Sequence, residues 1–212
     1  MKAGQRRERE IAHARTDILD AAITAFASTG LHNTTMQDIA REAGYTAASL
    51  YTYFKSKQEI VDATVSLLTD EYIRVFDQPI PSGLSFRQRF ELVLQRQLEL
   101  AETRHNVFVG FLSDNTNESM CASDDVGRAF HDNFERRIDR LAAWLKANAS
   151  AEDLGGHAPE LLARTLFGMA FGLMHRWGAE KNREPFVKYA PLMTELFFHG
   201  VSGKSKPGAR KK

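Results

Sequence analysis

The chain has 212 residues, 43% of them hydrophobic and 26% charged, and its formal net charge is +1, which identifies no partner. Its single cysteine, Cys121, excludes an internal disulfide, and no apolar run approaches the length of a membrane span. The amino-terminal residues are polar and charged and lack the apolar core of a signal peptide. We therefore expect a soluble, cytoplasmic protein with no membrane partner.

Apolar residues recur at helical spacing along the chain, and no strand-like alternation is sustained. The first helix carries its apolar face from Ile11 onward and ends before Gly30, where a left-handed residue is favoured. Thr35 and Asp38 resemble a capping box with aspartate in place of glutamate, so a short second helix is predicted to run to about Ala43.

Gly44 then interrupts the pattern, and Thr46 is placed to cap a third short helix that runs through Phe54. Ser56 begins a fourth helix, which ends before the Gln-Pro-Ile-Pro-Ser-Gly stretch at 78–83. Further helices are expected at 86–104, 106–113, 124–149, 159–179 and 185–200, with a loop at 114–123. The order of these elements predicts an all-α fold.

Two short helices joined at Gly44 have the layout of a helix-turn-helix, whose second short helix enters the DNA major groove. Because an isolated short helix is unstable, it needs a local core. The apolar residues available for that core are Phe26, Ile39, Ala40, Ala43, Leu50 and Phe54. The opposite face of the third helix leaves Thr46, Ala47, Ser49 and Tyr53 available to the groove, beside backbone N–H groups suited to phosphate.

Three short motifs lie in this region: Thr-Thr-Met-Gln-Asp-Ile-Ala at 34–40, Ala-Gly at 43–44 and Leu-Tyr-Thr-Tyr-Phe-Lys-Ser-Lys at 50–57. With them, residues 16–60 resemble the DNA-binding domain of the tetracycline-repressor (TetR) family. The rest of the chain is similar to that family only in helix number and pattern. The resemblance implies a DNA-binding domain at 11–57 and, at 58–201, a linker helix with a larger helical domain for ligand binding and dimerisation. A basic flexible arm at 1–10 and a basic flexible tail at 202–212 are expected to flank them.

The resemblance also implies operator contacts, mostly to phosphate, by Thr35, Thr46, Ser49, Tyr51, Tyr53 and Lys57. Ala47 and Ala48 stand where Lys-Gly is common in the family, and Ala47 is then a small apolar reader of a thymine methyl group. Tyr45 replaces a small aliphatic residue and either packs inward or lies against the DNA backbone. The family resemblance implies a repressor that binds double-stranded DNA at a palindromic operator as a homodimer.

The helix at 159–179 is apolar on nearly every side and so requires burial all round. One stripe contains two glycines four residues apart, which permits close approach of a partner chain. This stripe and the last helix together predict a dimer interface. Its residues are Leu161, Thr165, Gly168, Gly172, Leu192 and Leu196. In the TetR family the last two long helices of each subunit form such an interface.

Many of the 14 phenylalanines fall where a ligand chamber could be lined, although an ordinary core is the alternative. The candidate lining is Phe108, Phe111, Phe130, Phe134, Phe167, Phe171, Met174 and His175. Such a lining suits a small apolar or aromatic effector, whose identity stays open, and no cofactor is expected. In the family, a bound effector releases the DNA.

Two other functions stay open. One is an activator or an architectural helix-turn-helix protein. The other is a metal-dependent helical-bundle enzyme, because Glu-x-x-His occurs at 10–13 and again at 102–105. Neither sequence lies in an apolar interior stripe, so we expect no catalytic residue and no metal.

Overall fold

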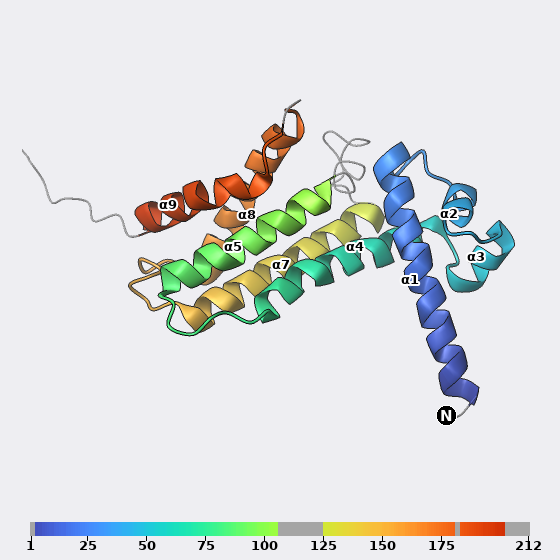
Figure 1. Ribbon diagram of the computed structural model, residues 1–212, viewed down its shortest axis with the longest axis horizontal. Helices are drawn as coiled ribbons and strands as arrows, with labels where there is room; N and C mark the ends of the chain where they lie inside the picture. The colour runs from blue at the N-terminus through green and yellow to red at the C-terminus, as the bar shows by residue number, and fades with distance from the viewer. Residues whose placement is uncertain (1–2, 106–124, 181–182, 202–212) are drawn as a thin grey trace, which may run out of the picture. The chain divides into compact units, whose positions relative to one another are not determined.

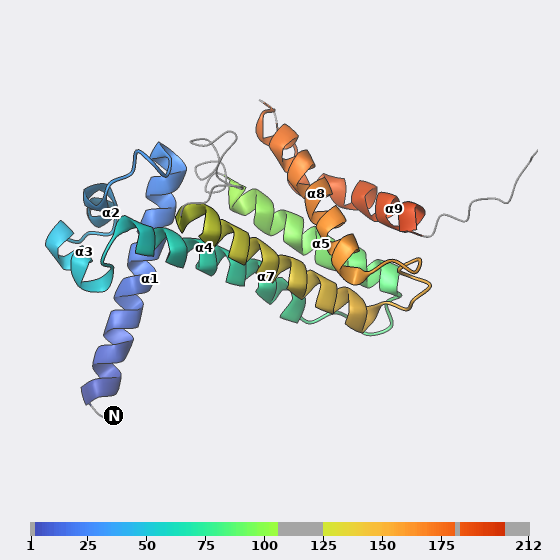
Figure 2. The same cartoon turned by 180° about the vertical axis from the view of Figure 1, so that it is seen from behind.

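The computed structural model describes residues 3–105, 125–180 and 183–201, which are almost entirely helical and contain no strand (Figures 1 and 2). The predicted all-α fold is thus confirmed. The described residues form two compact units, the first with 3–70, 104–105 and 125–134 and the second with 71–103, 135–180 and 183–201. None of the described helices is long and apolar enough to span a membrane.

The first unit is built on the long helix α1 (Ala3–Thr29). The short helices α2 (Met36–Glu42) and α3 (Ala47–Tyr53) lie against it, and α4 (Lys57–Arg74) follows (Figure 1). Its core contains side chains that are completely shielded from solvent: Ile18, Ala22, Phe26, Ile39, Leu50, Phe54 and Ile60. These residues come from all four helices, so each short helix is stabilised by packing rather than by its own length.

The first unit extends further along the chain than the sequence indicates. Ile60, Val61 and Val65 of α4 belong to the same buried cluster as the helix-turn-helix residues. The compact unit therefore continues to Asp70, and the domain boundary predicted after Lys57 falls too early.

The amino-terminal arm is helical where it is described. Because α1 begins at Ala3, the prediction of a flexible arm over 1–10 is wrong for residues 3–10 (Figure 1). The segment contains no proline, and Arg6 pairs with Glu10 one turn later at 2.8 Å. Since the buried half of α1 supplies the helix nucleus, adding exposed turns to it carries little further free-energy cost.

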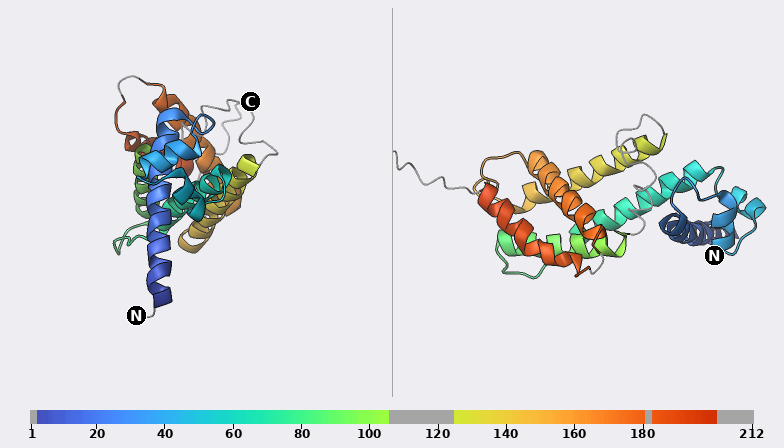
Figure 3. Two further views of the ribbon diagram at one scale, coloured as in Figure 1. Left: turned by 90° about the vertical axis from the view of Figure 1, so that its right-hand side faces the viewer. Right: turned by 90° about the horizontal axis from the view of Figure 1, so that it is seen from above.

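The second unit contains the end of α4, the 3₁₀ turn η1 (Val75–Asp77), α5 (Phe86–Thr103) and most of α7 (Asp125–Asn148). It is completed by α8 (Pro159–Gly178), η2 (Phe186–Tyr189) and α9 (Ala190–Val201). Helix α9 lies against α5 and α8 (Figure 3). The core of this unit is strongly aromatic, with the Phe90 and Phe197 rings stacked at a centroid distance of 4.4 Å.

The last helical stretch differs from the single helix predicted at 185–200. A 3₁₀ turn, η2, precedes α9, and Pro191 lies in the first turn of α9. Proline has no N–H to donate to the carbonyl four residues earlier, so the helix cannot continue unbroken through it. The helix predicted at 106–113, the loop at 114–123 and the tail at 202–212 lie outside the described residues.

Candidate nucleic-acid interface

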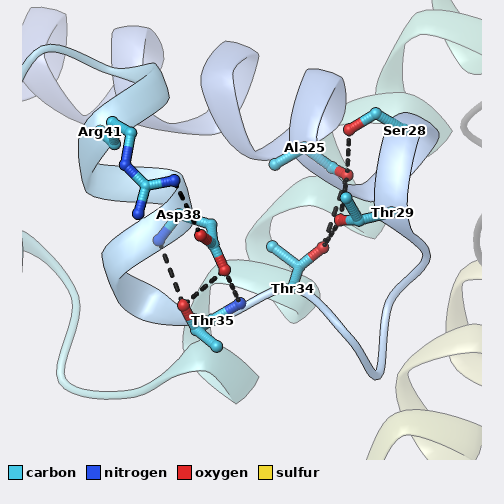
Figure 4. Close-up of polar contacts among 7 residues, drawn as sticks. All are labelled: Ala25, Ser28, Thr29, Thr34, Thr35, Asp38 and Arg41. Atoms are coloured by element: carbon cyan, nitrogen blue, oxygen red, sulfur yellow. Dashed lines mark hydrogen bonds and ion pairs between the residues drawn. The ribbon is translucent and has the colours of Figure 1, made fainter.

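The start of α2 is fixed by a reciprocal pair of hydrogen bonds (Figure 4). The Asp38 backbone N–H donates to the Thr35 hydroxyl at 3.2 Å, and the Thr35 backbone N–H donates to the Asp38 carboxylate at 3.0 Å. This confirms the predicted capping box. The bonds from the Thr35 hydroxyl and backbone, with help from Arg41, hold the pKa of Asp38 below its ordinary value.

Thr34, next to that cap, is buried and ties the loop between α1 and α2 to the end of α1 (Figure 4). Its hydroxyl lies 2.7 Å from the Thr29 hydroxyl and 2.6 Å from the Gly30 carbonyl oxygen. Gly30 has φ 82°, the left-handed conformation expected at the end of a helix. This residue of the Thr-Thr motif therefore supports the structure and does not face outward.

Helix α3 begins after Gly44, which has φ 73°. The Thr46 hydroxyl caps the helix by accepting a hydrogen bond from the Ser49 N–H at 3.1 Å, as the sequence predicts. As an acceptor in that bond, the Thr46 hydroxyl keeps its hydrogen for another acceptor, such as a phosphate oxygen. The Thr35 hydroxyl differs, because it donates to the Asp38 carboxylate at 2.6 Å.

The two faces of α3 are distinct. Leu50 is completely buried and anchors the helix. Thr46, Ser49 and Tyr51 are exposed, and Tyr51 shows 54% of its surface to solvent, while Ala47 is half-buried. The exposed face carries hydroxyl groups and no charged side chain. Any hydrogen bond from an α3 side chain to a phosphate is therefore donated by a neutral hydroxyl group.

Tyr53 and Tyr45 pack against each other with ring centroids 5.8 Å apart in an edge-to-face arrangement. Both rings are half-buried and lie against the core of the first unit. Tyr45 thus packs inward, one of the two positions expected from the sequence. Tyr53 is less available than predicted, because much of its ring supports the turn.

Lys57 has a different environment from the one the family resemblance implies. Its ammonium donates hydrogen bonds to the carbonyl oxygens of Leu31 at 2.8 Å, His32 at 3.2 Å and Thr34 at 2.9 Å. An ammonium has three N–H donors, so these carbonyl groups satisfy it. The side chain thus joins the start of α4 to the loop between α1 and α2, and its contact with phosphate stays a prediction.

Arg15 of α1 forms a second clamp, which holds the residues after α3 and the start of α4. Its guanidinium donates to the backbone carbonyl of Tyr53, reaches Glu59 at 3.3 Å and lies 4.0 Å from the centre of the Phe54 ring. The Lys55 backbone N–H and Arg15 together lower the pKa of Glu59. The sequence signal for this clamp is spacing, since Arg15 lies one helical turn before the buried Ile18 on α1.

The candidate chamber residues are divided between the two units. Phe130 and Phe134 are half-buried in the first unit, while Phe167, Phe171 and Met174 are half-buried or buried in the second. His175 is exposed on α8, so the prediction that it lines an interior chamber is wrong for the single chain. The 3.6-residue period turns His175 away from the side that buries Met174. Phe108 and Phe111 lie outside the described residues.

The candidate interface residues share one property: all six are exposed in the single chain. Leu161, Leu192 and Leu196 show 57%, 48% and 52% of their surface to solvent. A methyl group placed on Gly168 or Gly172 would meet nothing within 4 Å. Thr165 lies on the same exposed stripe of α8. Exposed leucines on two adjoining helices are typical of a surface that another protein covers.

The two Glu-x-x-His sequences are engaged in other contacts. Glu10 pairs with Arg6, His13 contacts Asp17 at 3.2 Å, and the Glu102 carboxylate accepts the Phe186 backbone N–H at 2.7 Å. Within the ranges that the structure describes, no group of three or more His, Cys, Asp or Glu side chains could hold a metal ion.

Comparison with known proteins agrees with this geometry. Residues 18–64 match the family model of the bacterial regulatory proteins of the tetR family. The chain is 36% identical over 92 residues to the HTH-type transcriptional repressor KstR2 of Rhodococcus jostii, an alignment that covers 43% of this chain and 45% of that protein. It is 26% identical over 188 residues to the fatty acid metabolism regulator protein of Bacillus subtilis, covering 88% and 95% of the two chains.

Solved structures share the whole fold. The transcriptional regulator FadR of Bacillus subtilis in complex with stearoyl-CoA superimposes with a TM-score of 0.72 at 20% identity, covering 87% of this chain and 98% of that one. A fatty acid degradation regulator, FadR of Bacillus halodurans, gives a TM-score of 0.73 at 13% identity over 91% and 96% of the two chains. The capped helix-turn-helix lies in residues 18–64, and this segment is identified by the family model as that of the bacterial regulatory proteins of the tetR family.

Proposed function

We propose that this protein is a ligand-responsive transcriptional repressor that binds a palindromic operator as a homodimer and acts by binding rather than catalysis. The observation that carries the proposal is the exposed hydroxyl-bearing face of α3, held on a buried core by two capped helix starts. Such a helix fits the width of the DNA major groove. Its place of action is then the cytoplasm, where bacterial DNA lies.

The exposed stripe on α8 and α9 supports dimerisation. A two-fold dimer uses the same surface on both subunits, so the leucines at 161, 192 and 196 would cover their own counterparts. Gly168 and Gly172 would let the two α8 backbones approach closely. Two DNA-binding units related by a two-fold axis require a palindrome with half-sites about 34–36 Å apart, or a multiple of that distance.

Control by an effector rests on the relatives. The Bacillus subtilis relative is named a fatty acid metabolism regulator, and a FadR structure of the same fold holds stearoyl-CoA. These names support an effector with a long apolar part. The effector would relieve repression by binding more tightly to a conformation that does not fit the operator.

Footprinting on the DNA upstream of the protein's own gene tests the proposal. We expect one protected palindrome for the wild-type protein and loss of protection for the Tyr51→Ala variant. Transcription in vitro from the same template should fall when the protein is added. Uniform coating without sequence preference would indicate an architectural protein, and increased transcription from a protected palindrome would indicate an activator.

A further inference from the structure

Arg137, on α7 in the second unit, lies over two aromatic rings from other helices. Its guanidinium carbon is 3.7 Å from the centre of the Tyr72 ring, near the end of α4, and 4.9 Å from the centre of the Phe167 ring on α8. All three side chains are half-buried. Helix α4 is also held here by α5, since the Gln97 amide donates to the Tyr72 carbonyl at 2.9 Å. The guanidinium is thus kept in place by well-anchored neighbours.

Two nearby arginines of the same unit have carboxylate partners, and Arg137 has none in the described part of the chain. Arg140, one turn along α7, pairs with Asp77, and Arg164 of α8 pairs with Glu135 at 2.6 Å. Glu135, the α7 carboxylate that precedes Arg137, is therefore already engaged. The guanidinium of Arg137 lies instead against the rings of Tyr72 and Phe167.

This environment leaves a positive charge poorly compensated. Removal from water lowers the pKa of Arg137, yet arginine stays protonated at neutral pH because its ordinary pKa is so high. Contact with aromatic rings recovers part of the lost hydration energy, but a ring offers no hydrogen-bond acceptor in the guanidinium plane. The N–H groups of Arg137 donate to no acceptor among the described residues.

The N–H groups of a planar guanidinium bind a carboxylate or a phosphate with two parallel hydrogen bonds. The rings beside it would contact the apolar part of the same molecule. We propose that Arg137 binds the anionic group of the effector, which narrows the small apolar or aromatic effector expected from the sequence to an anionic amphiphile. This inference rests on the proposed control by an effector.

Binding of matched twelve-carbon probes to the full-length protein tests the inference: dodecanoate carries a carboxylate, dodecanoyl-CoA carries phosphates, and dodecan-1-ol is neutral. Affinities come from the quenching of tryptophan fluorescence. We expect wild-type protein to bind at least one anion more tightly than the alcohol by about tenfold or more, since hydrogen bonds to charged groups contribute about 1.5–3 kcal/mol. Whichever anion is preferred identifies carboxylate or phosphate as the group bound.

Arg137→Gln should remove this preference and leave the affinity for dodecan-1-ol unchanged. Arg140→Gln is the matched control, because Arg140 lies on the same helix over the Phe76 ring but has a carboxylate partner, and it should keep the preference. Arg137→Lys should retain part of the preference for the anionic probe. If circular dichroism shows that Arg137→Gln is unfolded, the probe affinities of Arg137→Lys test the inference in its place.

A wild-type protein without anion preference, or an Arg137 variant that keeps the full preference, would overturn the inference and leave Arg137 as a packing residue. Operator binding is measured in parallel without any probe. Failure of the wild-type protein to bind its operator would reject the proposed function and leave the anion site intact. The two proposals can therefore be rejected independently.

Discussion

The Lys57 ammonium lies 2.8 Å from the carbonyl oxygen of Leu31, a contact that joins two segments 26 residues apart in sequence. Two further carbonyl oxygens accept hydrogen bonds from the same ammonium, so this lysine of the sequence motif at 50–57 connects two parts of the first unit. The loop that carries these carbonyls leads directly into the cap of α2. The orientation of α2 relative to α4 therefore depends on this side chain.

Lys57→Met should lower the free energy of unfolding by about 1–3 kcal/mol, because the part-buried carbonyl groups of Leu31 and Thr34 lose a charged donor. Thermal unfolding followed by circular dichroism measures the effect. Lys55→Met is the control, since Lys55 is exposed in the same segment and its side chain makes no comparable contact to backbone carbonyls. If Lys57→Met unfolds like the wild-type protein and only weakens operator binding, Lys57 contacts phosphate after all.

Tyr51→Ala and Tyr53→Ala should separate DNA binding from stability. Tyr51 is exposed, so its replacement should weaken operator binding, roughly tenfold for one lost hydrogen bond to a charged phosphate, without changing the unfolding temperature. Tyr53 packs against Tyr45, so its replacement should lower the unfolding temperature. Gel-shift titrations and thermal unfolding of both variants provide the comparison. Equal unfolding temperatures would show that the Tyr53 ring is not a structural support.

The Asp38 carboxylate should contribute to stability in a pH-dependent manner. Because its pKa is lowered in the folded state, chiefly by the Thr35 hydroxyl and backbone, its contribution is complete above the ordinary aspartate pKa. The contribution disappears as the pH falls through the lowered value. Asp38→Asn should therefore destabilise the protein at neutral pH, and the difference from wild type should shrink in acid.

Urea unfolding at a series of pH values measures this difference. Asp20→Asn is the control, since Asp20 is an exposed aspartate on α1 that caps no helix. A difference between wild type and Asp38→Asn that stays constant down to strongly acidic pH would mean that the carboxylate charge is not what stabilises the cap.

Gly172→Trp should prevent dimerisation without disturbing the fold of the subunit. A Cβ atom at position 172 would meet nothing within 4 Å in the single chain, and the position lies on the exposed stripe of α8, so we expect the indole to clash with a partner chain. Gly4→Trp is the matched control, because Gly4 is also helical and equally open, but lies on α1. Sedimentation velocity should show a monomer for Gly172→Trp and a dimer for Gly4→Trp. A dimeric Gly172→Trp variant would place the interface elsewhere.

The amino-acid sequence by itself determined the features that depend on neighbouring residues. The capping box of Thr35 and Asp38, the cap at Thr46 and the left-handed glycines at 30 and 44 all follow from groups a few residues apart. Their geometry is set by the local backbone, so a motif is sufficient to predict them. Helical periodicity likewise indicated the exposed stripe on α8 that carries Leu161.

Tertiary structure alone decided the roles of the long, charged side chains. Whether Lys57 faces a phosphate or the Leu31 carbonyl, and whether Arg137 has a carboxylate partner, depends on which distant segments lie within reach of their flexible ends. The same packing buries part of Tyr53 and turns His175 to solvent. A charged group is compensated by whatever the fold brings near it, and spacing along the chain does not specify that partner.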